Sequence, residues 1–133
     1  MIQVYNNNVQ VSTNTVIPFT KTPIKTGCVA TINSEGTVMY LNRPGIYKVE
    51  LDATVIPAAD GTVSVQLTLD GSNIVPATSS SYQSAGFATE VGINTLVAVD
   101  RTCLCLGGKK LQAVYTGAAG TINTVNVIVT KIR

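Results

Sequence analysis

The sequence predicts an all-β protein built from antiparallel strands. The clearest sign is the segment Thr62–Leu69, TVSVQLTL, in which apolar and polar residues alternate. Alternation with a period of two is typical of a pleated strand that buries one face in a core. Asp70 and Gly71 follow directly, and this dipeptide is a strong hairpin signal. Turn residues recur about every 10 residues and no helical period of useful length appears, which together predict a β-sandwich or jelly roll.

Length and composition favour one domain with an unusually uncharged surface. A chain of 133 residues has room for a single compact core. Hydrophobic residues make up 45% of the chain and charged residues 12%, which is about half the usual charged share. Much of the surface must therefore be Thr, Ser, Asn and Gln, or be covered by another subunit. The net charge of +2 is spread along the chain, so no basic stripe for nucleic acid is expected.

The N-terminal region carries the weakest strand signals. Val9–Val16 predicts a weak first strand, and the segment after it contains Pro18 and Pro23, which are typical of irregular or edge structure. We therefore expect residues 1–25 to form an N-terminal arm or edge strand and residues 26–133 to form the jelly-roll domain.

This N-terminal region also suggests a role in attachment. Residues 1–15 could grip a partner such as a capsid, and VYNNNVQV at 4–11 could add a strand to a partner's sheet edge. A polar arm of this kind can become ordered only on assembly. The first residues show no secretory signal, and no stretch approaches the ~20 apolar residues of a membrane span, so membrane insertion is not expected.

The middle of the chain contains the clearest strands. CVATIN at 28–33 and TVMYL at 37–41 flank a turn and predict a hairpin. Ile46–Ile56 is the best half-buried strand, and residues 57–61 turn it into the next one. Its apolar residues share one face and its polar residues the other: Tyr47, Val49, Leu51, Ala53 and Val55 against Lys48, Glu50, Asp52 and Thr54.

The segment Ala77–Gly86, ATSSSYQSAG, is polar and small and predicts an exposed loop. Function tends to lie in such loops on β scaffolds. Ser79, Tyr82 and Gln83 are therefore the candidate ligand residues, with Tyr82 as the large side chain. The alternative is a flexible polar connection with a half-buried tyrosine.

The remaining sequence predicts further strands separated by glycine-containing turns. A division near Gly92 separates two of them, and a turn at 117–120 precedes the last. These strands are expected at 74–75, 87–91, 94–106, 111–116 and 123–132.

In order and spacing, several segments resemble the jelly roll shared by tumour necrosis factors, complement globular heads and collagen-like spore and phage surface proteins. They are GIYKVEL, GTVSVQLTLDGSNIVP, a small-residue loop, LQAVYTG and VNVIVTKI, and the likeness runs from Cys28 to the C-terminus. Gly45, Ile46 and Tyr47 match the G-x-Y motif that opens a central strand in that superfamily. The resemblance implies a compact homotrimer with both chain ends at one pole, and it makes Tyr47 a core or interface aromatic. It carries over no ligand site.

The last two strands pose a burial problem that also points to assembly. In the last strand, valines form one face, whereas Ile128 and Ile132 lie on the other. Tyr115 poses the same problem against Val114 one strand earlier. We therefore expect a subunit interface that includes Tyr47, Tyr115, Ile128 and Ile132. A few exposed aliphatic side chains, or loops covering both faces, would also explain the pattern.

The sequence offers no catalytic set. It contains no histidine, so the common general base and the Ser-His and Cys-His pairs are excluded. Cys28, Cys103 and Cys105 are odd in number and predict buried free thiols rather than a disulfide framework or a metal site. Glu50 and Asp52 share a strand face and resemble a glycosidase couple or cation site, but a solvated strand face explains them better. No cofactor and no metal are expected.

These observations favour a non-enzymatic structural or adhesive protein. The leading expectation is a trimeric jelly roll on a virion surface, as a bacteriophage capsid decoration, head fibre or receptor-binding module. Its partners would be other virion or cell-surface proteins and host glycans. The alternatives are a bacterial surface or spore-coat domain and a carbohydrate-binding module, although the latter usually needs the Trp that this chain lacks.

Overall fold

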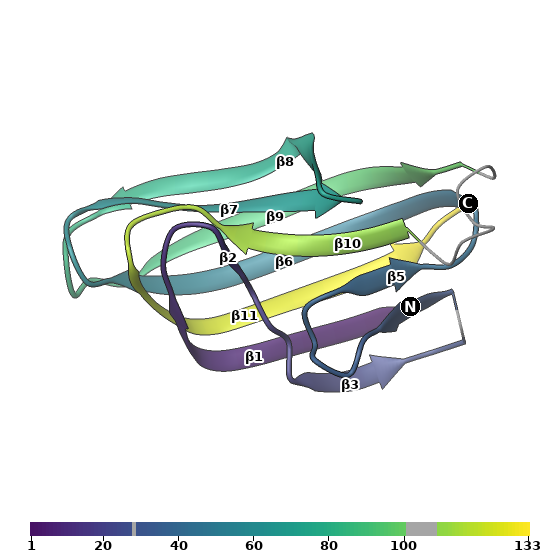
Figure 1. Ribbon diagram of the computed structural model, residues 1–133, viewed down its shortest axis with the longest axis horizontal. Helices are drawn as coiled ribbons and strands as arrows, with labels where there is room; N and C mark the ends of the chain where they lie inside the picture. The colour runs from purple at the N-terminus through teal and green to yellow at the C-terminus, as the bar shows by residue number, and fades with distance from the viewer. Residues whose placement is uncertain (28, 101–108) are drawn as a thin grey trace.

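Two antiparallel sheets pack face to face in a computed structural model that describes residues 1–27, 29–100 and 109–133, with the backbone alone at 74–77 and 79 (Figure 1). One sheet has the order β3-β1-β11-β6-β9, and the other has the order β4-β5-β10-β7-β8 with β2 beside β10. The strands are β1 (Ile2–Val11), β2 (Thr15–Val16), β3 (Lys21–Lys25), β4 (Ala30–Ile32), β5 (Met39–Leu41), β6 (Gly45–Pro57), β7 (Gly61–Leu69), β8 (Ser72–Gln83), β9 (Thr89–Val99), β10 (Lys109–Tyr115) and β11 (Gly120–Lys131). The described residues contain no helix, so the all-β prediction is confirmed.

The core between the sheets is mainly aliphatic, as the alternation predicted. In β6, each residue predicted to face inward is buried, from Tyr47 to Val55. Val63, Val65 and Leu67 of β7 are also fully buried. Burying such a side chain stabilises a fold by roughly 1.5–3 kcal/mol. The inward faces of the long strands therefore hold the two sheets together.

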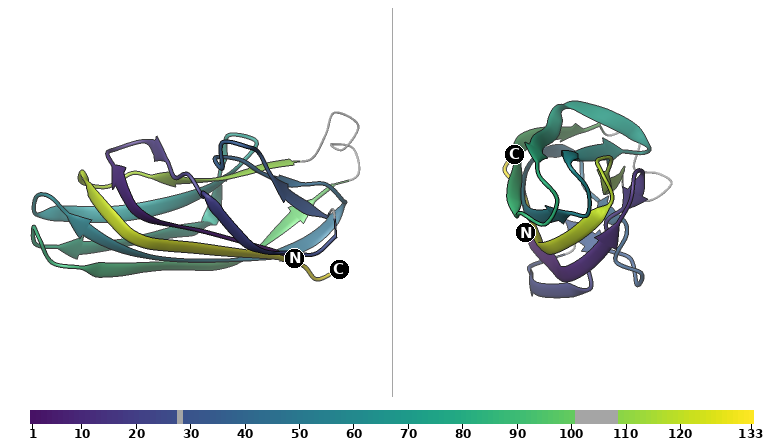
Figure 2. Two further views of the ribbon diagram at one scale, coloured as in Figure 1. Left: turned by 90° about the horizontal axis from the view of Figure 1, so that it is seen from below. Right: turned by 90° about the vertical axis from the view of Figure 1, so that its left-hand side faces the viewer.

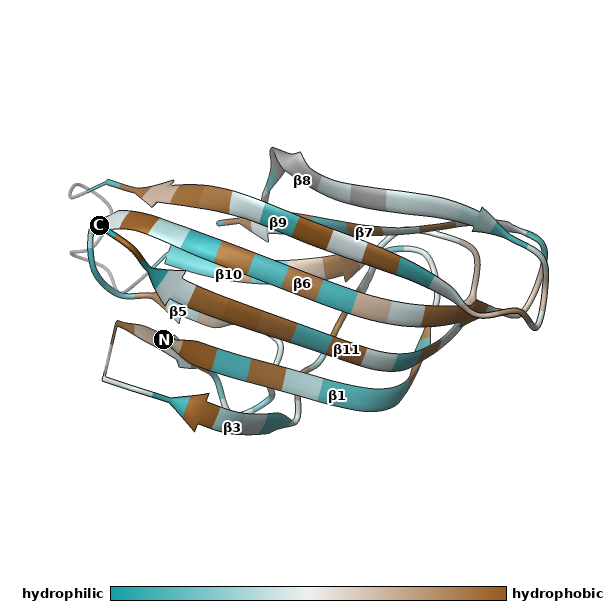
Figure 3. Ribbon diagram, turned by 180° about the vertical axis from the view of Figure 1, so that it is seen from behind, coloured by the Kyte–Doolittle hydropathy of each residue, from teal (hydrophilic) through white to brown (hydrophobic). Residues whose placement is uncertain are grey.

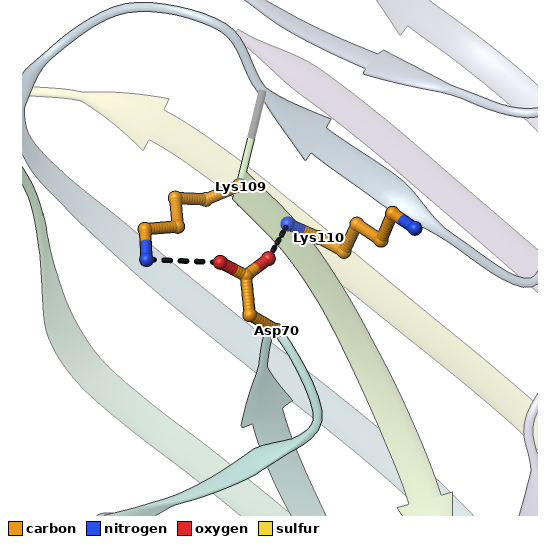
Figure 4. Close-up of polar contacts among 3 residues, drawn as sticks. All are labelled: Asp70, Lys109 and Lys110. Carbon is orange, nitrogen blue, oxygen red and sulfur yellow. Dashed lines mark hydrogen bonds and ion pairs between the residues drawn. The ribbon is translucent and has the colours of Figure 1, made fainter. Parts of the chain in front are cut away.

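The predicted hairpin turn after β7 is present. Asp70 and Gly71 both have positive φ angles, 51° and 84°, which the tight turns of β-hairpins require. Asp70 Oδ1 accepts the backbone N–H of Lys110 at 2.9 Å, and Asp70 Oδ2 lies 2.9 Å from Lys109 Nζ (Figure 4). The hydrogen bond from Lys110, with help from Lys109, lowers the pKa of the Asp70 carboxyl. The Asp70 side chain thus bonds this turn to β10.

The prediction of a loop at 77–86 is wrong for most of its length. Residues 72–83 form β8, whose backbone pairs with β7 from Leu69↔Ser72 to Gly61↔Gln83. The segment has no apolar alternation because β8 ends the hydrogen-bonded order of its sheet. A strand at the edge needs fewer buried side chains than a central one, so its composition resembles that of a loop.

The predicted division near Gly92 is also wrong. β9 runs unbroken from Thr89 to Val99 and pairs with β6 along its whole length. Gly92 points to the solvent side, so its missing side chain leaves the inward alternation of Val91 and Ile93 intact. Residues 101–106 of the strand predicted here lie outside the described residues, as do the three cysteines.

The N-terminal segment belongs to the five-stranded sheet. β1 lies between β11 and β3, and Ile2 and Val4 are fully buried in the core. The first strand therefore begins well before the predicted Val9. One edge of residues 4–11 pairs with β11 of the same chain, so the idea that they add a strand to a partner's sheet stays a prediction for the other edge alone. β3, which contains Pro23, is the edge strand of this sheet.

Both chain termini lie at the same end of the sandwich, as Figures 1 and 2 show. We call this the terminal end. The turns that follow β6, β8 and β10 gather at the opposite end, which we call the distal end. There Ala58 donates its N–H to Ala119 O at 2.9 Å, and Gly86 donates its N–H to Pro57 O at 2.9 Å. None of the described residues forms a helix that is long and apolar enough to cross a membrane.

Candidate functional site

The candidate site is the solvent-facing side of the β3-β1-β11-β6-β9 sheet, which we call the outer face (Figure 3). Its residues alternate along each strand with the buried ones, so brown and teal alternate along the ribbons in Figure 3. Strand register brings residues far apart in sequence into rows across this face. The central row, from one edge to the other, is Lys21, Tyr5, Asn126, Asp52 and Gly92.

Gly92 creates a hollow in the outer face. Asp52 lies between Asn126 on β11 and Gly92 on β9, and a Cβ atom at Gly92 would lie 3.2 Å from Asp52 Oδ1. The hollow has a volume of about 590 Å³, and Glu90 and Thr54 also line it. The missing side chain at one position therefore opens a depression that Asp52 and Glu90 make acidic.

A second hollow adjoins the first along β6. It has a volume of about 400 Å³, shares Asp52 and Gly92, and adds Glu50 and Asn94. Lys48 Nζ lies 2.9 Å from Glu50 Oε1 in an ion pair exposed to solvent. The carboxylates of Asp52 and Glu90 have no ion pair within the described residues. The two hollows together form an anionic depression suited to a cationic or hydrogen-bond-donating group.

The depression holds no cluster of ligand groups typical of a metal centre among the described residues. No three acidic, histidine or cysteine residues come together as metal ligands in the described parts of the chain. Gln3 Nε2 donates to Asn126 Oδ1 at 2.9 Å beside the depression.

Exposed apolar side chains lie among polar ones on the part of the outer face nearest the terminal end. Leu96 on β9 is 57% exposed, and Ile132 after β11 is 53% exposed. Ile128 lies opposite Glu50 and is partly buried. Ile128 and Ile132 were predicted at an interface, and both lie on this solvent-facing side. Leu96 was missed, although its alternation with Val97 was visible in the sequence.

The two tyrosines predicted at the interface belong to the core instead. Tyr47 and Tyr115 are fully buried by residues of their own chain. The Tyr47 hydroxyl donates to Arg43 O at 2.6 Å and accepts the Arg43 N–H at 3.2 Å, and the Tyr115 hydroxyl donates to Ala118 O. Burial raises the pKa of both hydroxyls. The interface prediction is corrected for both rings, because strand alternation points them between the sheets, and Tyr47 takes the core position that was its other predicted place.

The predicted ligand residues belong to β8, where Tyr82 and Gln83 lie near the distal end and Ser79 lies further along the strand. Tyr82 is 68% exposed there, and Gln83 Nε2 donates to Ala88 O at 3.2 Å. The backbone of Ser79 belongs to β8, and its side chain lies outside the described atoms. Phe87, in the turn between β8 and β9, is 65% exposed and was missed because it was assigned to a strand. The distal end therefore exposes two aromatic rings.

Comparison with solved structures decides the fold. The globular domain of the zebrafish complement 1qA protein matches with a TM-score of 0.72 and 12% identity, covering 99% of this chain and 96% of that chain. Eiger TNF from S. frugiperda matches with a TM-score of 0.70 and 13% identity, covering 99% and 92%. The chain has a tumour-necrosis-factor-like jelly-roll fold.

Further comparisons agree with this TNF-like jelly roll. Murine APRIL matches with a TM-score of 0.66 and 9% identity, covering 98% of each chain. No protein-family profile and no curated protein sequence matches this chain. The likeness therefore lies in the fold, as the G-x-Y start of β6 and the order of the segments predicted.

Proposed function

We propose that this protein is a non-enzymatic structural surface protein that acts as a homotrimer. The observation that carries the proposal is the outer face, where exposed aliphatic side chains border a hollow on an otherwise well-packed sandwich. Leu96 and Ile132 would lose their contact with water in an assembly, which is the usual reason for such a patch. Homologues with the TNF-like and complement-head fold are typically trimeric, which supports this choice of assembly.

The proposed site of action is the surface of a virion, with the protein serving as a bacteriophage capsid decoration, head fibre or receptor-binding module. The separation of the two ends supports display. Both termini lie at one end, where attachment would leave the distal end free. Three copies of Tyr82 and Phe87 would then face outward together, and multivalent contact raises avidity without a strong single site.

Light scattering on a size-exclusion column tests the assembly. We expect a mass three times the 13.9 kDa of the chain. Leu96→Arg should dissociate the trimer, because it places a charge in the proposed apolar contact, and it should still fold because Leu96 is exposed. Phe87→Arg is the matched control at the distal end and should remain trimeric. A monomeric wild type, or equal behaviour of the two variants, would refute the interface.

The proposed location on the virion surface is tested on purified virions. Immunogold labelling of virions purified from a producing culture should show regular label on the capsid or tail. Label on bacterial cells or spores, with bare virions, would instead favour a bacterial surface or spore-coat domain. For the receptor-binding role, a double Tyr82→Ser and Phe87→Ser variant should lose attachment to host cells while keeping its mass.

A further inference from the structure

Charges of opposite sign lie near the two opposite edges of the five-stranded sheet. At one edge, the strand β3 carries Lys21 and Lys25, both exposed and without an ion pair in the described part of the chain. Lys21 pairs with Tyr5 and points to the outer face, whereas Lys25 pairs with the core-facing Ile2 and points to the other face of the strand. Near the other edge, which β9 forms, Asp52 and Glu90 line the hollow. Lys21 and Asp52 lie in the same row of the outer face, with Tyr5 and Asn126 between them. The two charge groups are thus too far apart to meet within one chain.

β3 is also unusual because all five of its residues are exposed. It pairs with β1 at three positions, and the register shifts between Gln3 and Tyr5. Ile24 is 39% exposed on this strand. An edge strand with lysines and a proline resists pairing with another strand. A partner would therefore contact the side chains of β3, and not extend the sheet.

We propose that β3 of one copy docks onto the acidic hollow of the next copy in the homotrimer, with Lys21 facing Asp52 and Glu90 and Lys25 adding positive charge at the same edge. This inference rests on the proposed trimer and names the contact that orients it. A ring of three copies needs two different patches on each copy that complement each other. The basic edge and the acidic hollow are such a pair, and each copy has one of each.

Gly92 gives the hollow room to receive a side chain. The depression of about 590 Å³ lies directly over Gly92, next to Asp52 and Glu90. An ammonium group on a long flexible stem can enter a depression while its stem covers apolar surface. Because these charges are exposed in the free chain, their pairing should guide association and should weaken as salt screens it.

Charge reversal tests the contact in the full-length protein. We would measure the trimer dissociation constant by analytical ultracentrifugation for the wild type, for K21E/K25E, for D52K/E90K and for the variant with all four changes. Each double variant should dissociate at least about tenfold more readily, because like charges then face each other. The fourfold variant should recover near-wild-type assembly, because both patches have exchanged sign.

A matched control separates the contact from net charge. R43E/K110E changes two exposed cations outside the proposed contact, by the same total charge as K21E/K25E, and should assemble as the wild type does. Charge-neutral K21Q/K25Q should fall between the wild type and K21E/K25E, and thermal unfolding of each variant checks that it folds. A trimer unaffected by K21E/K25E, or a fourfold variant that stays dissociated, would overturn the contact and leave the trimer standing. A monomeric wild type would overturn both.

Discussion

Asp70 shows how much one residue determines in this fold. It adopts a positive φ angle that few residues other than glycine accept easily, and aspartate is one of them. Its carboxylate then accepts the Lys110 N–H and pairs with Lys109, both on β10 (Figure 4). The turn after β7 is therefore bonded to the neighbouring strand as well as closed on itself.

This arrangement predicts a pH-dependent stability difference for Asp70→Asn. The pKa of Asp70 is lowered in the folded protein, so its charge stabilises the fold above the ordinary aspartate value of 3.8 and stops doing so as the pH falls through the lowered pKa. Asparagine accepts the same φ angle and can still accept the Lys110 N–H. At pH 7 the variant should lose up to about 1 kcal/mol, as is typical of an exposed pair.

Urea unfolding of the wild type and Asp70→Asn at pH 7, 5, 4 and 2.5 measures this difference. The gap between the two proteins should shrink toward acid pH. A gap that stays constant over this range would show that the charge of Asp70 contributes nothing. Tyr82→Phe, a change on an exposed side chain, should leave the free energy of unfolding unchanged at each pH.

At the scale of elements, the turn between β4 and β5 is held against the irregular segment before β3. Phe19 donates its N–H to Gly36 O at 2.8 Å, and Phe19 itself is buried in the core. Gly36 has a φ angle of 77°, and a Cβ atom there would lie 2.1 Å from Phe19 O. Because Gly36 has no side chain, this turn can approach the backbone of Phe19 closely. Phe19 lies where the chain passes from β2 in one sheet to β3 in the other.

Gly36→Ala should therefore destabilise the protein far more than Gly71→Ala. Both glycines have positive φ angles, so both substitutions cost about 1–2 kcal/mol of backbone strain. Gly71 has open space around it, whereas at Gly36 the backbone of Phe19 must also move. We expect at least about 2 kcal/mol of additional loss for Gly36→Ala. Equal losses in chemical unfolding would show that the close approach of Phe19 is unimportant.

At the scale of the whole molecule, β1 completes the sandwich. It places Ile2, Val4, Val9 and Val11 in the core and pairs with β11 along its length. β11 in turn lies between β1 and β6, at the middle of its sheet. Removing β1 would expose the edge of β11 together with the apolar residues that β1 covers, so the N-terminal segment is structural in the free chain.

A variant that begins at Ser12 should fail to fold cooperatively. The loss of four buried aliphatic side chains, each worth roughly 1.5–3 kcal/mol, approaches the entire stability of a typical domain. Near-ultraviolet circular dichroism and thermal unfolding would measure this loss. A truncated protein with a native-like spectrum and a cooperative transition would mean that residues 1–11 are a dispensable arm after all.

The sequence predicted the central strands well and the edges poorly. β6 and β7 bury one face each, so their alternation is strong and their bounds were nearly correct. β8 lies at an edge and has few residues that must be apolar, which made it resemble a loop. β1 was placed too late because its polar asparagines interrupt the alternation. Asn8 has a φ angle of 55° there, and the register with β11 skips this residue.

For the candidate site too, the sequence predicted the features that depend on alternation within one strand. Glu50, Asp52, Ile128 and Ile132 were assigned to solvent-facing positions from alternation within single strands, and the structure places them there. Tyr47 and Tyr115 were assigned to an interface, although alternation placed both in inward rows. The position of Gly92 opposite Asp52 could not be predicted, because strand pairing between β6 and β9 joins residues that are distant in the chain.

Local sequence patterns were enough to predict an antiparallel β-sandwich with an aliphatic core and a sparsely charged surface. These properties depend on local alternation and turn chemistry, which neighbouring residues specify. The folded structure was needed to show that β1 is internal, that a hollow opens at Gly92, and that a basic edge and an acidic hollow lie near opposite edges of one sheet. Those features depend on the register of strands far apart in the sequence, and long-range register is set by how the whole core packs.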